Sequence, residues 1–246
     1  MKRTNPVFNR INKMNDYYSS DYVCATYKGI GAKILIYVLV TLVGAALGIY
    51  LLFNNPNIII GSLIFSGIFT FIFAMIAMMV PKASMICGTL YCLFEGVFVG
   101  VLSLLLETMI PGVVITSVLG TLSIVLVVGV LYLTGLVKAT SGFYRFLMMF
   151  SIGAIVTMML LFIASLFPMF SGLFDNIGVT LLVAGISLLL ASLFLISDLK
   201  QATSIVESGS PKQYEWLAAF GIAYTVIWIY IEVLRIVAII AARADN

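Results

Sequence analysis

Long runs of apolar residues dominate this chain, and they restrict its possible folds more than any other feature. Seven runs approach or exceed the ~20 residues that a helix needs to cross a bilayer. A polar or proline-containing segment ends each of the first six. Only 9% of the residues are charged, against about 25% in a soluble domain. The runs are residues 30–53, 58–80, 84–106, 113–136, 143–167, 177–199 and 214–242.

This pattern predicts an all-α integral membrane protein with seven transmembrane helices, because the strands of a β-barrel would give alternating segments of about ten residues instead. The connecting segments are too short to hold a soluble domain. We therefore expect a basic tail at residues 1–29 and a single seven-helix domain at residues 30–246. Residues 200–213 are the longest predicted polar linker.

The basic residues predict the orientation of the chain. They collect in the tail and in alternate loops, while the intervening loops carry none. Because loops rich in Lys and Arg stay on the cytoplasmic side, we expect a multi-pass protein of the cell membrane with a cytoplasmic N-terminus. After seven spans the C-terminus is expected outside. Arg235 and Arg243 then lie on the side that the rule disfavours, so either the earlier charges overrule them or the last helix does not fully cross. The basic loop residues are Lys82, Lys138, Arg145, Lys200 and Lys212.

Several classes of protein are disfavoured by what the chain lacks. It contains no histidine, which excludes histidine-based acid–base catalysis and histidine metal sites. Cys24, Cys87 and Cys92 show no CxxC spacing and are expected to be packing residues. We see no nucleophile with a base partner and no phosphate-binding loop. We therefore expect no enzyme activity, no cofactor and no nucleic-acid partner, with the lipid bilayer as the certain surroundings.

Ionisable groups inside the apolar runs are the candidates for function, since a charge at mid-helix costs about 2.5–3.5 kcal/mol on insertion scales. Glu95 lies about eleven residues into the third run, near the bilayer midplane. It is either an ion-pathway residue or a hydrogen-bonded glutamate between helices. Asp198 is predicted at the cytoplasmic end of the sixth run, where it is either a gating carboxylate or an ordinary acid near Lys200.

The last run carries an unusual number of polar groups for a membrane helix. Gly221, Thr225, Trp228 and Glu232 fall within about 80° of one another on a helix. This stripe predicts a face turned into the bundle, with the other six helices as its wall. Glu232 and Arg235 are three residues apart and can form an ion pair that neutralises both charges.

Glu215 begins the same run, across one linker from Asp198. If the two carboxylates lie close together, they share a proton and titrate as a pair. Such a pair would form a pH-sensitive latch without histidine.

Small residues predict where helices approach each other closely. Gly44 and Gly48 in the first run, and Gly96 and Gly100 in the third, have the GxxxG spacing that allows close helix packing in membranes. We interpret both pairs as packing features.

Several of these residues form a pattern that resembles the Bax inhibitor-1-like (transmembrane Bax inhibitor motif) membrane proteins, specifically a bacterial branch. The pattern covers nearly the whole chain, and residues 198–235 are its most specific part. It consists of Asn5-Pro6, Ala25-Thr26-Tyr27-Lys28-Gly29, Glu95-Gly96, Asp198, Gly209-Ser210-Pro211-Lys212, Glu215-Trp216, Ala219-Phe220-Gly221, Trp228, Tyr230, Glu232 and Leu234-Arg235.

The resemblance implies a seven-helix bundle with the last helix enclosed by the other six. It also implies, for some members, a pH-sensitive calcium leak gated by paired aspartates on the last two helices. Asp198 matches the first aspartate. The second has no match, and Thr225 is the nearest position to it.

Two functions follow as hypotheses. The favoured one is a cation leak, with calcium as the permeant ion, along a path beside the last helix. Asp198 would be the cytoplasmic gate, Glu95 the midplane site, and Glu232 with Arg235 the outer site. Asp198 and Glu95 are weak calcium-binding candidates. The alternative is a non-conducting membrane protein that modulates a membrane protease or a stress response, motivated by the missing aspartate and by helix surfaces rich in Met and Phe.

Overall fold

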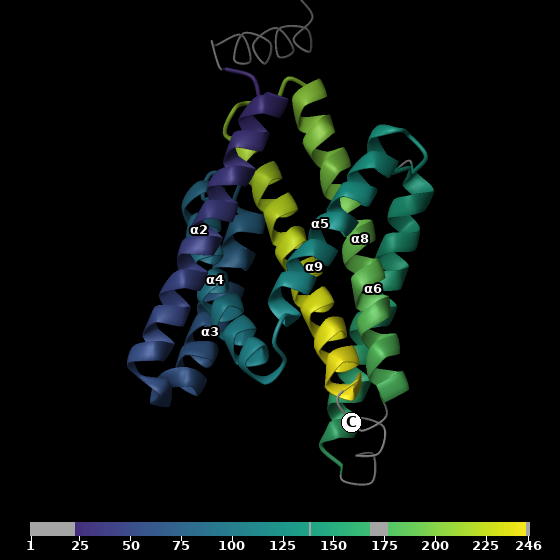
Figure 1. The fold of residues 1–246 in the computed structure, drawn as a ribbon. Helices are drawn as coiled ribbons and strands as arrows, with labels where there is room; N and C mark the ends of the chain where they lie inside the picture. Colours follow the sequence, from purple (N-terminus) through teal and green to yellow (C-terminus); the bar gives the residue numbers. More distant parts are fainter. Residues whose placement is uncertain (1–22, 138, 168–176, 245–246) are drawn as a thin grey trace, which may run out of the picture.

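The chain is built from long α-helices (Figure 1). The computed structural model describes residues 23–137, 139–167 and 177–244; residues 1–22 of the predicted basic tail and Lys138 lie outside this part. Seven helices are long and apolar enough to cross a membrane, as predicted. They are α2 (Tyr27–Asn54), α3 (Ile59–Met79), α4 (Ser84–Met109), α5 (Val113–Leu133), α6 (Ser141–Ser165), α8 (Ile177–Glu207) and α9 (Tyr214–Ala244), with a 3₁₀ turn η1 (Pro56–Ile58) between α2 and α3.

The predicted end of the sixth helix is wrong. The apolar run predicts an end at Leu199, but α8 continues through the more polar segment 200–207. This segment holds Ala202, which is buried, and it ends where Gly209 adopts a left-handed backbone with φ of 65°. The amides of Gly209 and Ser210 bond back to the carbonyls of Val206 and Ile205, as in a Schellman cap. Hydropathy locates the end of an apolar segment, whereas this helix continues beyond it.

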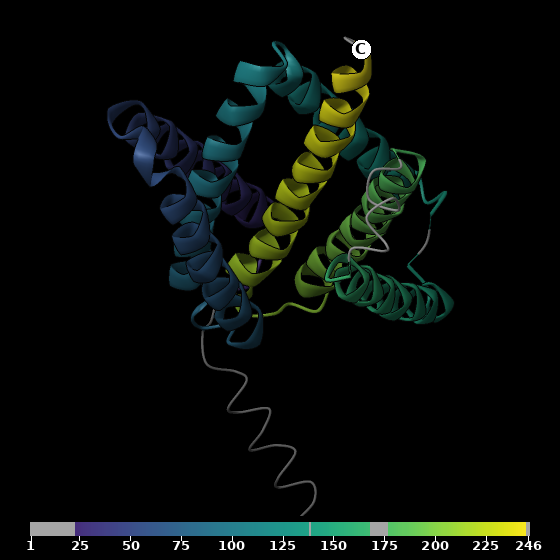
Figure 2. The same cartoon turned by 90° about the horizontal axis from the view of Figure 1, so that it is seen from below.

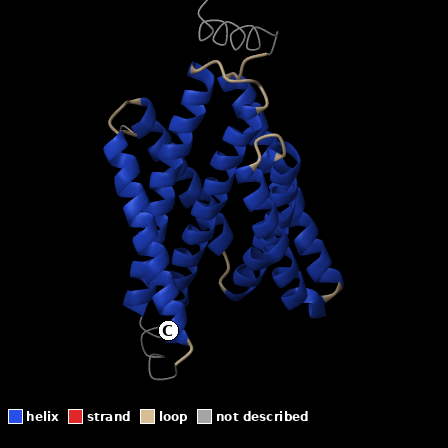
Figure 3. Ribbon diagram, turned by 180° about the vertical axis from the view of Figure 1, so that it is seen from behind, coloured by secondary structure: helices blue, strands red, loops and turns tan. Residues whose placement is uncertain are grey.

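The last helix lies in the middle of the bundle. α9 packs against α8, α5, α2, α4 and α3, and Figure 2 shows it crossing between the group α2–α4 and the group containing α6 and α8. α6 packs mainly against α8. The expected enclosure of α9 is therefore provided closely by five helices. The start of α2 and the C-terminal end of α9 lie at opposite ends of the bundle, as Figure 3 also shows from behind.

The two GxxxG pairs are packing features, as predicted, and the structure shows that they pack against each other. A Cβ atom added at Gly44 would collide with the carbonyl of Leu93 and lie 3.1 Å from the Cα of Gly96. At Gly100 it would lie 2.6 Å from the Cα of Ala45. Only glycine at these positions lets the backbones of α2 and α4 come this close, so the pair forms a rigid wall beside α9.

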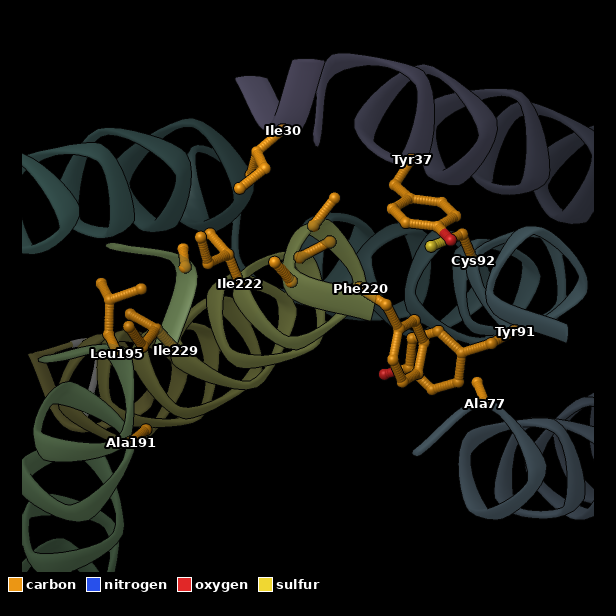
Figure 4. Packing of buried hydrophobic residues seen from close by; sticks show 14 of the residues in the cluster. Ile30, Tyr37, Ala77, Tyr91, Cys92, Ala191, Leu195, Phe220, Ile222 and Ile229 are labelled. Carbon is orange, nitrogen blue, oxygen red and sulfur yellow. The ribbon is translucent and has the colours of Figure 1, made fainter. Parts of the chain in front are cut away.

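Aromatic side chains fill the space between this wall and α9. Phe220 of α9 is fully buried and makes edge contacts with Tyr37 of α2 and Tyr91 of α4, at ring-centroid distances of 6.2 and 5.1 Å. Figure 4 shows the rings of Phe220 and Tyr91 together, with Tyr37 of α2 on the side of Cys92. The packing fixes the rotation of α9, and hence the direction in which its polar stripe points.

Candidate functional site

The centre of the site is a hydrogen bond between α8 and α9. The hydroxyl of Thr225 donates to Oδ2 of Asp198 at 2.5 Å. One turn earlier on α9, a Cβ atom at Gly221 would lie 3.5 Å from Oδ1 of the same carboxylate. Thr225 thus holds Asp198 directly, while the small Gly221 leaves room for its carboxylate against the backbone of α9.

Asp198 and Thr225 line a cavity of about 800 Å³ between α6, α8 and α9, with Met78 of α3 at its edge. The lining is mainly apolar, and its polar groups concentrate along the seam of α8 and α9. No Lys or Arg occurs among the described lining residues. The polar lining residues of this seam are Ser187, Asp198, Gln201, Tyr224, Thr225 and Trp228.

The polar stripe predicted on the last helix faces this seam, as expected. Gly221, Thr225 and Trp228 all line the cavity. Glu232 continues the stripe: its Oε1 accepts a hydrogen bond of 2.7 Å from Ser187 and a longer one, 3.4 Å, from the indole of Trp228. The sequence-based interpretation of this face is therefore confirmed.

The predicted pairing of Glu232 with Arg235 is also present. The guanidinium of Arg235 lies 3.2 Å from Oε2 of Glu232. The Glu232 side chain is 5% exposed, whereas that of Arg235 is 45% exposed. Glu232 is therefore paired with a cation at Oε2 and hydrogen-bonded at Oε1. The ion pair distinguishes it from Asp198, which has no salt bridge to a Lys or Arg of the described residues.

The structure gives Asp198 and Glu215 different partners, so the latch considered for this pair does not form. The carboxylate of Glu215 forms an ion pair with Lys33 of α2 and accepts hydrogen bonds from the amide and hydroxyl of Thr26, at 2.8 and 3.3 Å. Because α8 extends to Glu207, Asp198 lies about 13 Å of helix below that end. The two carboxylates therefore occupy different layers of the bundle, and Glu215 stabilises the fold rather than acting in a shared-proton latch.

Glu95 lies on the other side of α9 from the cavity. Its side chain is buried on α4, at 8% exposure, and it is absent from the cavity lining. Thr70 of α3 lies near enough to interact with it, although the Thr70 hydroxyl makes no hydrogen bond. Tyr224 of α9 interacts electrostatically with both Glu95 and Asp198. Among the described residues, neither Glu95 nor Glu232 bonds to another carboxylate, so the structure keeps the candidate carboxylates apart.

A comparison with protein families matches nearly the whole chain. The model described as Bax inhibitor 1 like covers residues 5–242. The chain belongs to this family. With its seven apolar helices, this Bax inhibitor 1 like chain is a multi-pass membrane protein in contact with the lipid bilayer. The comparison with curated protein sequences gives no match.

In this Bax inhibitor 1 like protein, the residue of α9 that faces Asp198 is Thr225. The resemblance implied an aspartate on the last helix opposite Asp198, and placed Thr225 nearest to that position. In the structure, Thr225 bonds directly to Asp198. A hydroxyl cannot share a proton between two acids as a carboxyl pair does. A paired-aspartate sensor is therefore not formed at this contact.

Sequence reasoning missed two partners of the candidate carboxylates in this Bax inhibitor 1 like protein. Lys33 is a basic residue inside the first apolar run, and this position was a usable signal, because a lysine there requires a partner. Ser187 gave no comparable signal. Serine is common in membrane helices and often bonds to its own backbone, as Ser192 does to Leu188 on the same helix.

Proposed function

We propose that this protein is a passive cation leak, with calcium as the favoured ion, and that the path follows the seam between α8 and α9. The observation that carries the proposal is Asp198, a carboxylate on a cavity whose described lining contains no basic side chain. Such a site favours cations over anions. A path of this kind needs no catalytic residue and no bound cofactor.

The residues along the seam take distinct roles in this proposal. The hydrogen bond between Thr225 and Asp198 holds the closed state, and Gln201 lies on the side of the basic loops, taken as cytoplasmic. Ser187 connects the cavity to Glu232, the outer site, whose charge Arg235 balances. Glu95 is a buried carboxyl group across α9 and does not line the cavity.

Calcium binds most tightly where six to eight oxygen ligands surround it. In the described part of the chain, His, Cys, Asp and Glu side chains do not gather in groups of three or more. Separate carboxylates along a seam suit a hydrated ion in transit better than a resident one. The proposal is therefore a leak of low affinity.

Calcium flux into proteoliposomes tests the proposal. We expect Asp198→Asn to lower the flux, because it removes the negative charge of the cavity. Thr225→Val should raise it, since the closed state loses a hydrogen bond to a charged group, worth at most about 1.5–3 kcal/mol. This corresponds to an increase of up to about ten- to a hundredfold in the open-to-closed ratio.

The matched control is Thr203→Val, which also removes a hydroxyl bond between helices, that of Thr203 with Tyr132 at 2.8 Å, but away from the cavity. Its flux should equal that of the wild type. Glu95→Gln should have a smaller effect than Asp198→Asn, because Glu95 does not line the cavity. Flux that equals that of empty vesicles in the wild type and every variant would refute the leak.

A second candidate function is a non-conducting protein that modulates a membrane protease or a stress response. The observation that favours it is that Asp198 faces Thr225 on α9 rather than a second aspartate. Crosslinking in native membranes, followed by purification, tests this candidate. A membrane protein recovered reproducibly, together with flux at the level of empty vesicles, would support it. Flux with no specific partner would rule it out.

A further inference from the structure

The cavity between α6, α8 and α9 has the dimensions of a small-molecule site. Its volume of about 800 Å³ falls within the ~300–1,000 Å³ of pockets that bind drug-sized ligands. The wall formed by α6 is mostly apolar, with Met149, Ile155 and Met158 among its residues. The polar groups lie opposite, along α8 and α9. An apolar wall facing a short polar seam fits an amphiphilic molecule.

The charge of the seam determines which amphiphile fits. Asp198 is the one carboxylate among the described lining residues, and no basic residue accompanies it. Oδ2 accepts the hydrogen bond of Thr225, and in the described part of the chain no donor bonds to Oδ1. A carboxylate in apolar surroundings gains most from a partner of opposite charge. Neutral and anionic ligands would leave it uncompensated.

Aromatic rings beside the carboxylate favour an organic cation over a metal ion as a resident ligand. Phe194 and Trp228 lie with their ring centroids 5.9 Å apart, and Tyr224 also lines the cavity. Aromatic faces attract ammonium groups. The apolar wall offers few of the oxygen ligands that a dehydrated calcium ion needs, but it matches a hydrocarbon body.

We propose that this cavity is a binding site for a lipophilic ammonium ion. The ammonium group lies at Oδ1 of Asp198, near the rings of Tyr224 and Trp228, and the apolar body lies along α6. Binding of the ammonium ion uses the same cavity as the proposed leak, but it does not require that the protein conducts ions. Binding can therefore succeed where the flux experiment fails, and the two results remain separate.

The two tryptophans of the chain make binding measurable. Trp228 lines the cavity and Trp216 does not, so Trp216→Phe leaves Trp228 as the single reporter. The probe is the nitroxide TEMPO carrying a hexyldimethylammonium group, which quenches tryptophan fluorescence on contact. Its uncharged counterpart is TEMPO hexyl ether. Both are titrated into the full-length Trp216→Phe protein in nanodiscs of neutral lipid, with empty nanodiscs correcting for partitioning.

We expect saturable quenching by the cationic probe, with an apparent affinity at least tenfold higher than that of the neutral probe. Asp198→Asn should lower the affinity for the cation at least tenfold and leave that for the neutral probe unchanged. The cavity-filling variant Gly153→Leu, with Asp198 intact, should abolish saturable quenching. Its control is Gly129→Leu, which also faces open space but lies outside the cavity.

Equal affinity of the two probes, or equal affinity of the cation for the wild type and Asp198→Asn, would overturn the proposal. So would saturable quenching that persists in Gly153→Leu. Circular dichroism of each variant confirms its helical content, and Gly153→Leu tests the site independently if Asp198→Asn does not fold.

Discussion

The ion pair between Lys33 and Glu215 provides a quantitative test of how the bundle is held together. Their side chains are 10% and 1% exposed, and Thr26 adds two hydrogen bonds to the carboxylate. Removing one partner of a buried pair costs about 3–5 kcal/mol, because the remaining charge is left uncompensated. This pair lies at the end of the bundle, nearer to water. We therefore expect Lys33→Met and Glu215→Gln each to lower the free energy of unfolding by about 2–4 kcal/mol.

The double variant separates the ion pair from the packing of its side chains. Lys33→Met with Glu215→Gln leaves no uncompensated charge, so its loss of stability should be smaller than the sum of the two single losses by about 1–3 kcal/mol. Unfolding by SDS in mixed micelles, followed by tryptophan fluorescence, measures all three. Trp216 lies beside the pair, with the Lys33 ammonium 5.1 Å from its ring centroid.

Lys28→Met is the matched control, since Lys28 is an exposed lysine on the same helix. It should change the free energy of unfolding by less than about 0.5 kcal/mol. If the two single variants add to within about 0.5 kcal/mol in the double variant, the pair is not coupled in the folded protein. This outcome would refute the role of the Lys33–Glu215 ion pair in holding α2 against α9.

Three further changes test other contacts by the same unfolding assay or by hydrogen exchange. Gly96→Leu should cost about 1–3 kcal/mol, by forcing α2 and α4 apart, whereas Gly129→Leu, with open space around it, should be neutral. Tyr37→Phe should cost about 1–3 kcal/mol, because the buried carbonyl of Ser84 loses its tyrosine donor. Glu107→Gln should speed exchange of the two amides that bond to this carboxylate at the start of α5, and unchanged exchange would contradict that role.

Features that depend on local sequence pattern could be predicted. The number of helices follows from run length, and the inward face of α9 follows from helical spacing. The glycine pairs were recognised from their spacing, although their partners were not. Each of these properties is encoded within one helix, where 3.6 residues per turn fix which side chains share a face.

Contacts between distant segments could not be predicted in the same way. Lys33 and Glu215 are 182 residues apart, and nothing in either run identifies the other as its partner. The depth of Asp198 was misjudged because the apolar pattern ends before the helix does. That boundary error placed Asp198 and Glu215 in one predicted layer, and the latch hypothesis depended on this placement.

The separation of these two carboxylates indicates which helices can move. Glu215 fixes the start of α9 to α2, whereas Asp198 joins α9 to α8, on which α6 packs. We therefore expect opening to shift α8 with α6 away from a fixed α9. Spin labels at Leu189 of α8 and Ile240 of α9, both exposed, should move apart in Thr225→Val, while the distance from Ile240 to a label at Leu39 of α2 stays constant. A change in the distance between Ile240 and Leu39 would show that α9 itself moves relative to α2. That result would refute the expectation that α8 and α6 move while α9 stays fixed.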